Sequence, residues 1–568
     1  MLKFSDMPYV RPDVDGVMRQ MNALCDRMER AADFAEADEC FLAFDQLEAE
    51  FDTACTLAYV RHQLDTTDEF YDKEVEFIDE NAPRAQEARQ RWEKILVSCP
   101  HRAQLEEKYG ALLFQNAELS LRAFDPKIIP ELQEENRLCT QYDKLLASAQ
   151  IPFEGENRTL AQMTPFKQSA DDAIRRRAWE AEAAFYTENG AQLDEIYDQL
   201  THLRDKMGRA LGFSGYTGLG YCRMQRNCYG QKEIEAFRRG VIRHIVPIAE
   251  RLYRAQAARL GVEYPMHFYD MSLNFRSGNA CPKGTADDIL ARTKRFYHEL
   301  SNETGEFIDF MYRYDLLDVL AKKGKSGGGF CTDLGIYDAP FIFANFNGTS
   351  GDVEVVTHEA GHAFAAYTAR NVRPRSMRWP GMESCEIHSM SMEFFAWPWA
   401  EGFFGDAADK FRFAHLSDAL TFIPYGTMVD HFQHEVYAHP DVTPAHRHET
   451  WRKLLKIYMP WVRLDDGLDF YGEGKGWQRQ HHIYESPFYY IDYCLAQSVA
   501  LQFWALDQRD HKDAWSRYLR LVRLGGTKNY RELVEAAGLC VPFDENALKD
   551  VAESATAYLD AFDPARLG

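Results

Sequence analysis

The chain has 568 residues, of which 46% are hydrophobic and 27% are charged, and its formal net charge at pH 7 is −23. Such an acidic chain lacks the basic surface that binding to nucleic acid or to anionic membranes requires. No apolar run reaches the length of a signal peptide or a transmembrane helix, and the twelve cysteines are scattered without a CxxC pair. We therefore expect a soluble, cytoplasmic protein with reduced thiols that binds neither nucleic acid nor membrane.

Apolar residues recur at three- and four-residue spacings along most of the chain, which is the pattern of amphipathic helices. In the first half, this pattern predicts helices over 14–35, 43–63, 69–98, 130–149, 169–187, 190–212 and 231–260. Between two of them, the stretch 151–160 alternates and turns at Glu154-Gly155, which predicts a small β-hairpin.

The middle of the chain changes character. Residues 322–330 form a basic, glycine-rich stretch that predicts a flexible loop, and the apolar run 340–346 predicts a strand. A helix should begin at Thr349 or Ser350, since either residue could cap its first turn. Later helices are predicted over 383–402, 409–438, 443–459, 487–508, 511–524 and 544–562. The expected fold class is mostly α, with one small sheet.

The helix predicted after the strand contains His358-Glu359-Ala360-Gly361-His362, an HExxH sequence. Residues four apart lie on one face of a helix, so both imidazoles can reach one zinc ion at about 2.0–2.1 Å each. Glu359 lies one step round the helix, where it can take a proton from a water molecule without binding the metal itself. This pattern predicts a zinc hydrolase.

A catalytic zinc needs a third protein ligand and an open fourth position. Four side chains in the next helical stretch are candidates for that ligand: Glu383, Glu386, His388 and Glu393. Glu386 follows His362 at a distance that leaves room for the end of one helix, a reversing loop and a returning helix. Glu393 lies two turns further along the same face, where it could accept the free N–H of a zinc histidine.

Four tyrosines and two histidines crowd into the thirteen residues from His481 to Tyr493. A helix that opens at Pro487 would place Tyr490 and Tyr493 on one face. In a zinc peptidase, a phenol or imidazolium donor completes the stabilisation of the oxyanion, and Tyr490, Tyr493 and His482 are the candidates. Without the zinc motif, core packing would be the favoured interpretation of such an aromatic stripe.

Three segments of the chain together resemble the thimet oligopeptidase / oligoendopeptidase F family of zinc peptidases, above all its bacterial oligoendopeptidase branch. They are NFNGTSGDVEVVTHEAGHAF, ESCEIHSMSMEFF and HIYESPFYYIDYCLAQ, and the run GFSGYTGLGYCRMQRNCYG is similar to the same branch. The resemblance implies that His358, His362 and Glu386 bind one zinc ion and that Glu359 is the general base and proton shuttle.

The same resemblance implies that Tyr490, Tyr493 and His482 donate hydrogen bonds to the transition state, with Tyr489 as a reserve candidate. It also implies a two-lobed helical ellipsoid with a deep substrate channel, the zinc at its floor and a small β-sheet beside the HExxH helix. The substrates would then be short, unstructured peptides, cleaved at internal bonds.

We expect an N-terminal helical lobe over 1–210 and a catalytic lobe over 211–568, and we expect the two lobes to interdigitate. The strand at 340–346 is expected at the edge of the sheet, where it would pair with the substrate backbone, and the loop 324–329 would close over it. Two alternatives remain open at this point. One is a metallocarboxypeptidase of similar helical build, and the other is a catalytically inactive helical scaffold that binds peptides.

Overall fold

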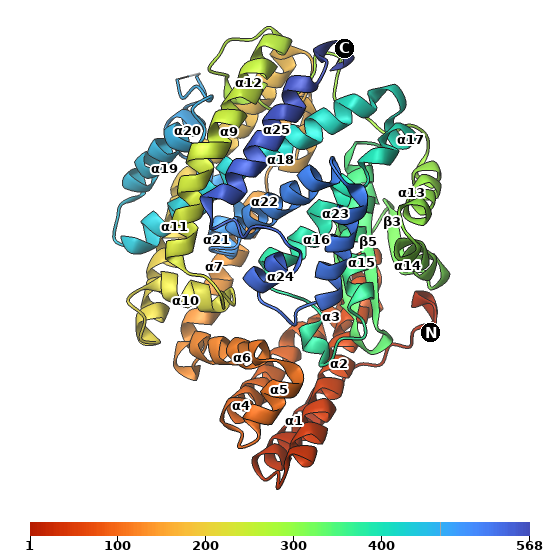
Figure 1. Ribbon diagram of the computed structural model, residues 1–568. Coiled ribbons are helices and arrows are strands. Elements are labelled where there is room, and N and C mark those ends of the chain that lie inside the picture. The colour runs from red at the N-terminus through yellow and green to blue at the C-terminus, as the bar shows by residue number, and fades with distance from the viewer. Residues whose placement is uncertain (466, 568) are drawn as a thin grey trace. The chain divides into compact units, whose positions relative to one another are not determined.

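The structure is a computed structural model that describes residues 1–465 and 467–567 (Figure 1). Most of these residues are helical, and the strands among them form two small sheets, so the predicted fold class is confirmed. No helix in the described part of the chain combines the length and the hydropathy that crossing a membrane requires.

The chain divides into two compact units, each built from three separate segments. Unit 1 comprises Met1–Leu121, Ala280–Ala408 and Leu506–Leu539. Its main elements are α1 (Val14–Glu29), α2 (Phe34–Leu64), α3 (Glu69–Asn81), α4 (Ala85–Ser98), α5 (Arg102–Tyr109), α6 (Ala111–Ala123), α13 (Ala286–Leu300), α14 (Asn302–Arg313), β3 (Leu317–Leu320), β4 (Phe330–Leu334), β5 (Ala339–Phe346), α15 (Gly351–Thr368), α16 (Met382–Phe395), α17 (Ala400–Phe404), α23 (His511–Leu524) and α24 (Tyr530–Ala536).

Unit 2 comprises Arg122–Asn279, Asp409–Ala505 and Cys540–Gly568. Its main elements are α7 (Ile129–Ala147), β1 (Ile151–Phe153), β2 (Glu156–Arg158), α8 (Leu160–Lys167), α9 (Asp172–Ala210), α10 (Tyr216–Arg223), α11 (Gln231–Gly240), α12 (Val246–Leu260), α18 (Ala408–Ala438), α19 (Pro444–Tyr458), α20 (Asp469–Gly472), α21 (His481–Glu485), α22 (Tyr490–Asp507) and α25 (Glu545–Ala561). Residue 210 lies within the segment Arg122–Asn279 of unit 2. The helices on its two sides, α9 and α10, pack against each other. The units therefore do not divide at the boundary that we expected.

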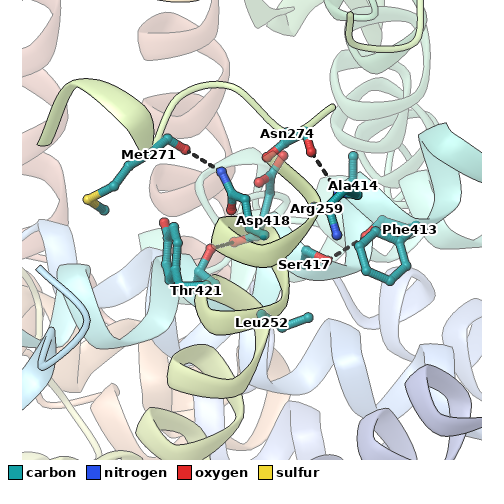
Figure 2. Close-up of a pocket in the computed structure, with 11 residues that line it drawn as sticks. Leu252, Arg259, Met271, Asn274, Phe413, Ala414, Ser417, Asp418 and Thr421 are labelled. Atoms are coloured by element: carbon teal, nitrogen blue, oxygen red, sulfur yellow. Dashed lines mark hydrogen bonds between the residues drawn. The ribbon is translucent and has the colours of Figure 1, made fainter. Parts of the chain in front are cut away.

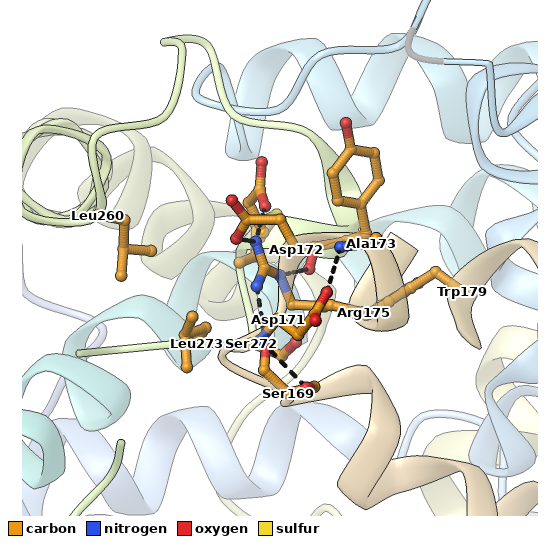
Figure 3. A network of polar contacts seen from close by, with 12 residues as sticks. Ser169, Asp171, Asp172, Ala173, Arg175, Trp179, Leu260, Ser272 and Leu273 are labelled. Carbon is orange, nitrogen blue, oxygen red and sulfur yellow. Dashed lines mark hydrogen bonds and ion pairs between the residues drawn. The ribbon is translucent and has the colours of Figure 1, made fainter. Parts of the chain in front are cut away.

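The helix α9 replaces two predicted helices with one of 39 residues. Its N-terminus is held by Arg175, whose guanidinium is buried and donates to the carbonyls of Tyr269 and Ser169 (Figure 3). The same guanidinium pairs with the buried carboxylate of Asp270, at 2.5 Å between Nη2 and Oδ1. Asp171 caps the first turn by accepting from two backbone amides. These contacts tie the start of α9 to the segment that follows α12.

A second buried arginine lies near the other end of α9. Arg204 donates to the carboxylate of Glu135 on α7 and to the hydroxyl of Tyr437 on α18, at 2.6 and 3.0 Å. It also donates to the carbonyl of Tyr484, which lies on the short helix α21. The guanidinium of Arg204 therefore links four helices of unit 2, and its bond to the carbonyl of Tyr484 helps to hold the five-residue α21 in position.

A small cavity lies between α12 and α18 in unit 2 (Figure 2). Its polar groups bond to the protein itself, because Gln256 donates to the carbonyls of Met271 and Leu273 and Arg259 donates to that of Asn274. The free volume is about 30 Å³, which holds one or two water molecules and no organic ligand. The hydrogen bonds around the cavity therefore hold the segment after α12 against that helix.

The larger sheet has the order β3-β5-β4, with β5 parallel to β3 and antiparallel to β4. The strand β5 is the one predicted at 340–346, but it lies in the centre of the sheet and is almost entirely buried. Its expected place at the edge is therefore wrong. The two edges of this sheet are β3 and β4; among the described strands β4 pairs with β5 alone, and four of its five residues are half-buried.

Candidate functional site

The helix α15 carries the HExxH sequence and follows β5 directly (Figure 1). Ser350 stands at its N-cap but makes no side-chain capping bond, and the Thr349 hydroxyl bonds to Asn347 instead. The carboxylate of Asp352 in the first turn accepts from the backbone amides of Asn347 and Gly348, both at 2.8 Å. The predicted start of the helix is therefore confirmed, but neither predicted residue caps it with its side chain, and Asp352 fixes the link between the strand and the helix instead.

The helices α15 and α16 approach each other closely at Gly361, the fourth residue of the motif. A Cβ atom there would lie 2.7 Å from Cα of Ser389 and 2.8 Å from the carbonyl oxygen of His388. The hydroxyl of Tyr518 on α23 donates to the same carbonyl at 2.8 Å. The absent side chain thus lets the two helices meet backbone to backbone, and Tyr518 holds α16 in that position.

This approach brings Glu386 of α16 to the two histidines of α15. Its Oε2 atom lies 3.4 Å from Nε2 of His358 and 3.5 Å from Nε2 of His362, and the three possible ligand atoms all lie within 4.8 Å of one another. Ligand atoms that are each about 2.0–2.1 Å from a zinc ion at tetrahedral angles are about 3.3–3.4 Å apart. The donor set and its spacing therefore fit a zinc ion.

The second ring nitrogens of the two histidines differ in their surroundings. Nδ1 of His358 lies 2.6 Å from Oε1 of Glu393, whereas the buried Nδ1 of His362 has no hydrogen-bond partner among the described residues. A carboxylate on the far nitrogen turns Nε2 of His358 toward the shared position. His358 keeps 28% of its side-chain surface exposed, against 11% for His362, so the cluster is accessible beside His358.

The charges around the cluster favour a cation. Burial would raise the pKa of Glu386, but its hydrogen bonds to His358 and His362 hold that pKa well below the ordinary range. Burial would lower the pKa of His358, but Glu386 and Glu393 raise it well above the ordinary value. Burial also raises the pKa of Glu359, which makes its carboxylate a stronger base than an exposed one. Three carboxylates thus converge on this position.

The two other candidates for the third ligand lie outside the cluster. Both Glu383 and His388 are buried, and neither contributes an atom to the group of possible metal ligands. Burial lowers the pKa of His388 to about 3, and neither of its ring nitrogens has a hydrogen-bond partner among the described residues.

In unit 2 the structure brings the predicted aromatic donors together. The ring of His482 on α21 lies with its centroid 4.9 Å from that of Tyr490 and 5.9 Å from that of Tyr493, both on α22. Tyr489 belongs to the same group, because its ring centroid lies 5.6 Å from that of His482. Burial raises the pKa of Tyr490 well above its usual value, so its hydroxyl stays protonated and can donate.

Some residues that shape these groups were not found from the sequence. Arg226 pairs with Asp492 in the first turn of α22 and donates to the carbonyl of Phe488, so it fixes the start of that helix. Phe488 itself has a φ of +69°, and the helix begins at Tyr490 rather than at Pro487. In the sequence, Arg226 stands close to Arg223 in the run 221–226, and this local positive charge does not indicate that Arg226 pairs with Asp492.

The site combines an HExxH helix with a carboxylate from a second helix, which is the arrangement found in metallopeptidases. Residues 4–124 match the Peptidase M3 N-terminal domain, and residues 165–553 match Peptidase family M3. The chain therefore belongs to peptidase family M3 and is a metallopeptidase.

Two solved structures and one curated protein are similar to the chain. A candidate oligoendopeptidase F is 47% identical and PZ peptidase A, solved with an inhibitor, is 46% identical, each with a TM-score of 0.92. Both comparisons cover 99% of this chain, and they cover 99% and 100% of those two chains. The oligoendopeptidase F homolog of Borreliella burgdorferi is 24% identical over 296 residues, which is 50% of this chain and 48% of that protein. The match thus spans about half the length of this curated relative.

Proposed function

We propose that the protein is a zinc endopeptidase that hydrolyses internal bonds of short, unstructured peptides. The observation that carries this proposal is the convergence of His358, His362 and Glu386 at the spacing of ligands around one zinc ion. The oligopeptide class of substrate rests on the relatives named oligoendopeptidase F.

His358, His362 and Glu386 would hold one zinc ion per chain. Bound there, zinc would supply Lewis acidity, which lowers the pKa of a water molecule and polarises a peptide carbonyl. Glu359 would take the proton of the attacking water and pass it to the nitrogen of the leaving amine. Glu393 would keep His358 in the tautomer and orientation that binding requires.

The aromatic group of unit 2 would act on the substrate carbonyl. Tyr490, Tyr493 and His482 would donate hydrogen bonds to the oxygen as it gains negative charge. The accessible edge of β4 would bind the peptide backbone by adding a strand to the sheet, in the role expected of 340–346. This arrangement suits an extended peptide, because its backbone N–H and C=O groups are free to pair with β4, whereas most of those in a folded protein are already paired.

The test combines metal analysis with a peptide digest. The purified protein should contain one zinc ion per chain, and 1,10-phenanthroline should abolish cleavage of a peptide library analysed by mass spectrometry. Internal cleavage should persist when the peptides carry C-terminal amides, whereas a carboxypeptidase would lose its substrate. A preparation without stoichiometric metal, or activity that ignores the chelator, would refute the proposal.

A further inference from the structure

A groove of about 530 Å³ runs along β4 within unit 1. One wall is the C-terminal half of α2, and the other is the glycine-rich loop with the first residues of β4. The lining residues are Thr56, Tyr59, Val60, Gln63, the three glycines 327–329, Phe330, Cys331 and Thr332. None of these lining side chains carries a charge at neutral pH. A charged ligand group would therefore find no counter-charge among the lining side chains themselves.

The loop that forms one wall is anchored at its start. Gly324 accepts from the backbone amide of Thr66 at 2.7 Å, and the amide of Ser326 donates to the carbonyl of Gln63 at 2.9 Å. The ammonium group of Lys325 is buried and bonds to the Asp318 carboxylate and to backbone carbonyls of β3 and β5. The segment that the sequence predicts to be flexible is thus tied to α2 and to the sheet up to residue 326.

Gly327 has no structural need to be glycine. Its φ lies outside the left-handed region, and a Cβ atom added to it would meet no atom within 4 Å. Gly328 differs, because its φ of +86° does favour glycine. Neither backbone conformation nor packing explains the missing side chain at Gly327, whereas an open groove does.

The groove and the HExxH helix share one neighbour, the strand β4. Cys331 lines the groove, and β4, to which it belongs, packs against α15. Burial raises the pKa of the Cys331 thiol, and the charge of Glu359 on α15 raises it further, which is consistent with the packing of β4 against that helix. A peptide that pairs with the edge of β4 would place alternate side chains on the two faces of the sheet.

We infer that this groove binds one uncharged side chain of the substrate peptide and that Gly327 sets the size of residue it accepts. The inference rests on the proposed function, because the occupant is the substrate itself. Tyr59, Val60 and Phe330 give the lining an apolar share, so leucine-sized and aromatic residues are the expected occupants.

The test compares Gly327→Leu with wild type on a library that varies one peptide position at a time. At one position, kcat/KM for large apolar residues should fall about tenfold or more, while peptides with glycine there keep their wild-type rate. Wild type should also disfavour Asp, Glu, Lys and Arg at that position. Thr56→Phe narrows the groove from the side of α2 and should produce the same position-specific change.

Gly402→Leu is the matched control. Gly402 also lies in unit 1, has no left-handed φ, and would meet no atom within 4 Å with a Cβ added. This variant should keep the wild-type profile, and its melting temperature shows what the substitution itself does to stability. If Gly327→Leu and Thr56→Phe kept the wild-type profile, or lost activity equally on all peptides, the groove would not be a side-chain subsite. If wild type and Gly402→Leu cleaved no peptide, the proposed function would fall and the groove inference with it.

Discussion

Nδ1 of His358 on α15 and Oε1 of Glu393 on α16 lie 2.6 Å apart. The same helix α16 also carries Glu386, the candidate third metal ligand. The contact selects the tautomer of His358 in which Nδ1–H donates a hydrogen bond to the Glu393 carboxylate and Nε2 keeps its lone pair. Glu393 is thus placed to orient a metal ligand, which is one of the two roles that the sequence left open for it.

Glu393→Gln should lower the affinity for zinc about 10–100-fold, because the amide orients His358 less well and does not raise its basicity. Competition with a fluorescent chelator measures the affinity. Glu306→Gln, at an exposed position of α14, is the control and should bind zinc as wild type does. Equal affinity in all three proteins would show that Glu393 has no part in metal binding.

Substitutions within the cluster should separate the base from the ligands. Glu359→Gln should keep its zinc but lose about 10²–10⁴-fold in kcat, because only the proton acceptor is removed. His358→Ala, His362→Ala and Glu386→Ala should each lose the metal, as measured by atomic emission after dialysis. If Glu386→Ala kept zinc at wild-type affinity, the third ligand would have to be Glu383 or His388.

The aromatic group should respond to the loss of single hydroxyls. Tyr490→Phe or Tyr493→Phe should lower kcat by about 10²–10³-fold with little change in KM, because the donor acts on the charge that forms in the transition state. Tyr489→Phe should instead turn over normally but lose about 1 kcal/mol of unfolding free energy, which appears as a slightly lower melting temperature. Normal turnover in all three variants would make the tyrosines packing residues and leave His482 as the next candidate.

Gly361→Ala should disturb the site through its frame. The added Cβ would lie 2.7–2.8 Å from the backbone of α16, so the helices must move apart at a cost of about 1–3 kcal/mol. Urea denaturation should report the lower stability, and zinc affinity should fall because Glu386 moves with α16. Gly402→Ala makes the same change in open space and should not destabilise. A stable Gly361→Ala variant with normal zinc affinity would contradict the close approach.

The buried ion pairs of unit 2 predict a dependence of stability on pH. Burial raises the pKa of Glu135, but Arg204 and Arg223 outweigh it and hold that pKa below its ordinary value. A lowered folded-state pKa means that the stabilisation is present above the unfolded pKa, about 4.3, and is lost as the pH falls through the folded value.

Glu135→Gln should therefore cost about 3–5 kcal/mol at pH 7, because it leaves two guanidinium groups without their carboxylate. Urea midpoints measured from pH 7 down to pH 3.5 should show the gap to wild type narrowing below about pH 4.3. Glu134→Gln, at the exposed neighbouring position, should stay close to wild type throughout. A gap that did not change with pH would mean that the charge of Glu135 is not what stabilises the fold.

Local patterns predicted much of this molecule, because helices and motif spacing depend on neighbours in the sequence. The face shared by His358 and His362 follows from their spacing alone. The helices predicted over 130–149, 409–438, 443–459, 487–508, 511–524 and 544–562 lie within a few residues of their predicted ranges, whereas the range 69–98 is divided into α3 and α4, and α5, α6, α13 and α14 were not predicted. The predicted ranges 169–187 and 190–212 are one helix, because α9 continues through the gap between them, and the buried Gln478 donates to the carbonyl of Gly190.

Features that depend on distant segments were not predictable in this way. The central place of β5 follows from its pairing with β3 on one side and β4 on the other, and no local pattern specifies that order. The contact of Gly361 with α16, and the hold of Tyr518 on that helix, likewise join segments far apart in sequence. For the same reason, spacing alone offered four possible partners for the histidine pair; the family resemblance singled out Glu386, and the structure places it beside both histidines.

The alternation of segments between the two units has a consequence for synthesis on the ribosome. The chain passes from one unit to the other five times, and the last segment of unit 1 ends at Leu539. At about 5–20 residues per second, the histidines of α15 emerge well before α23, whose Tyr518 holds α16, has been made. From Phe395 at the end of α16 to Tyr518, synthesis takes about 6–25 s at that rate, and during this time the candidate metal-binding side chains belong to an incomplete unit. The segments that carry these side chains are thus made before the unit around them is complete, and no contiguous fragment contains the whole of one unit without part of the other.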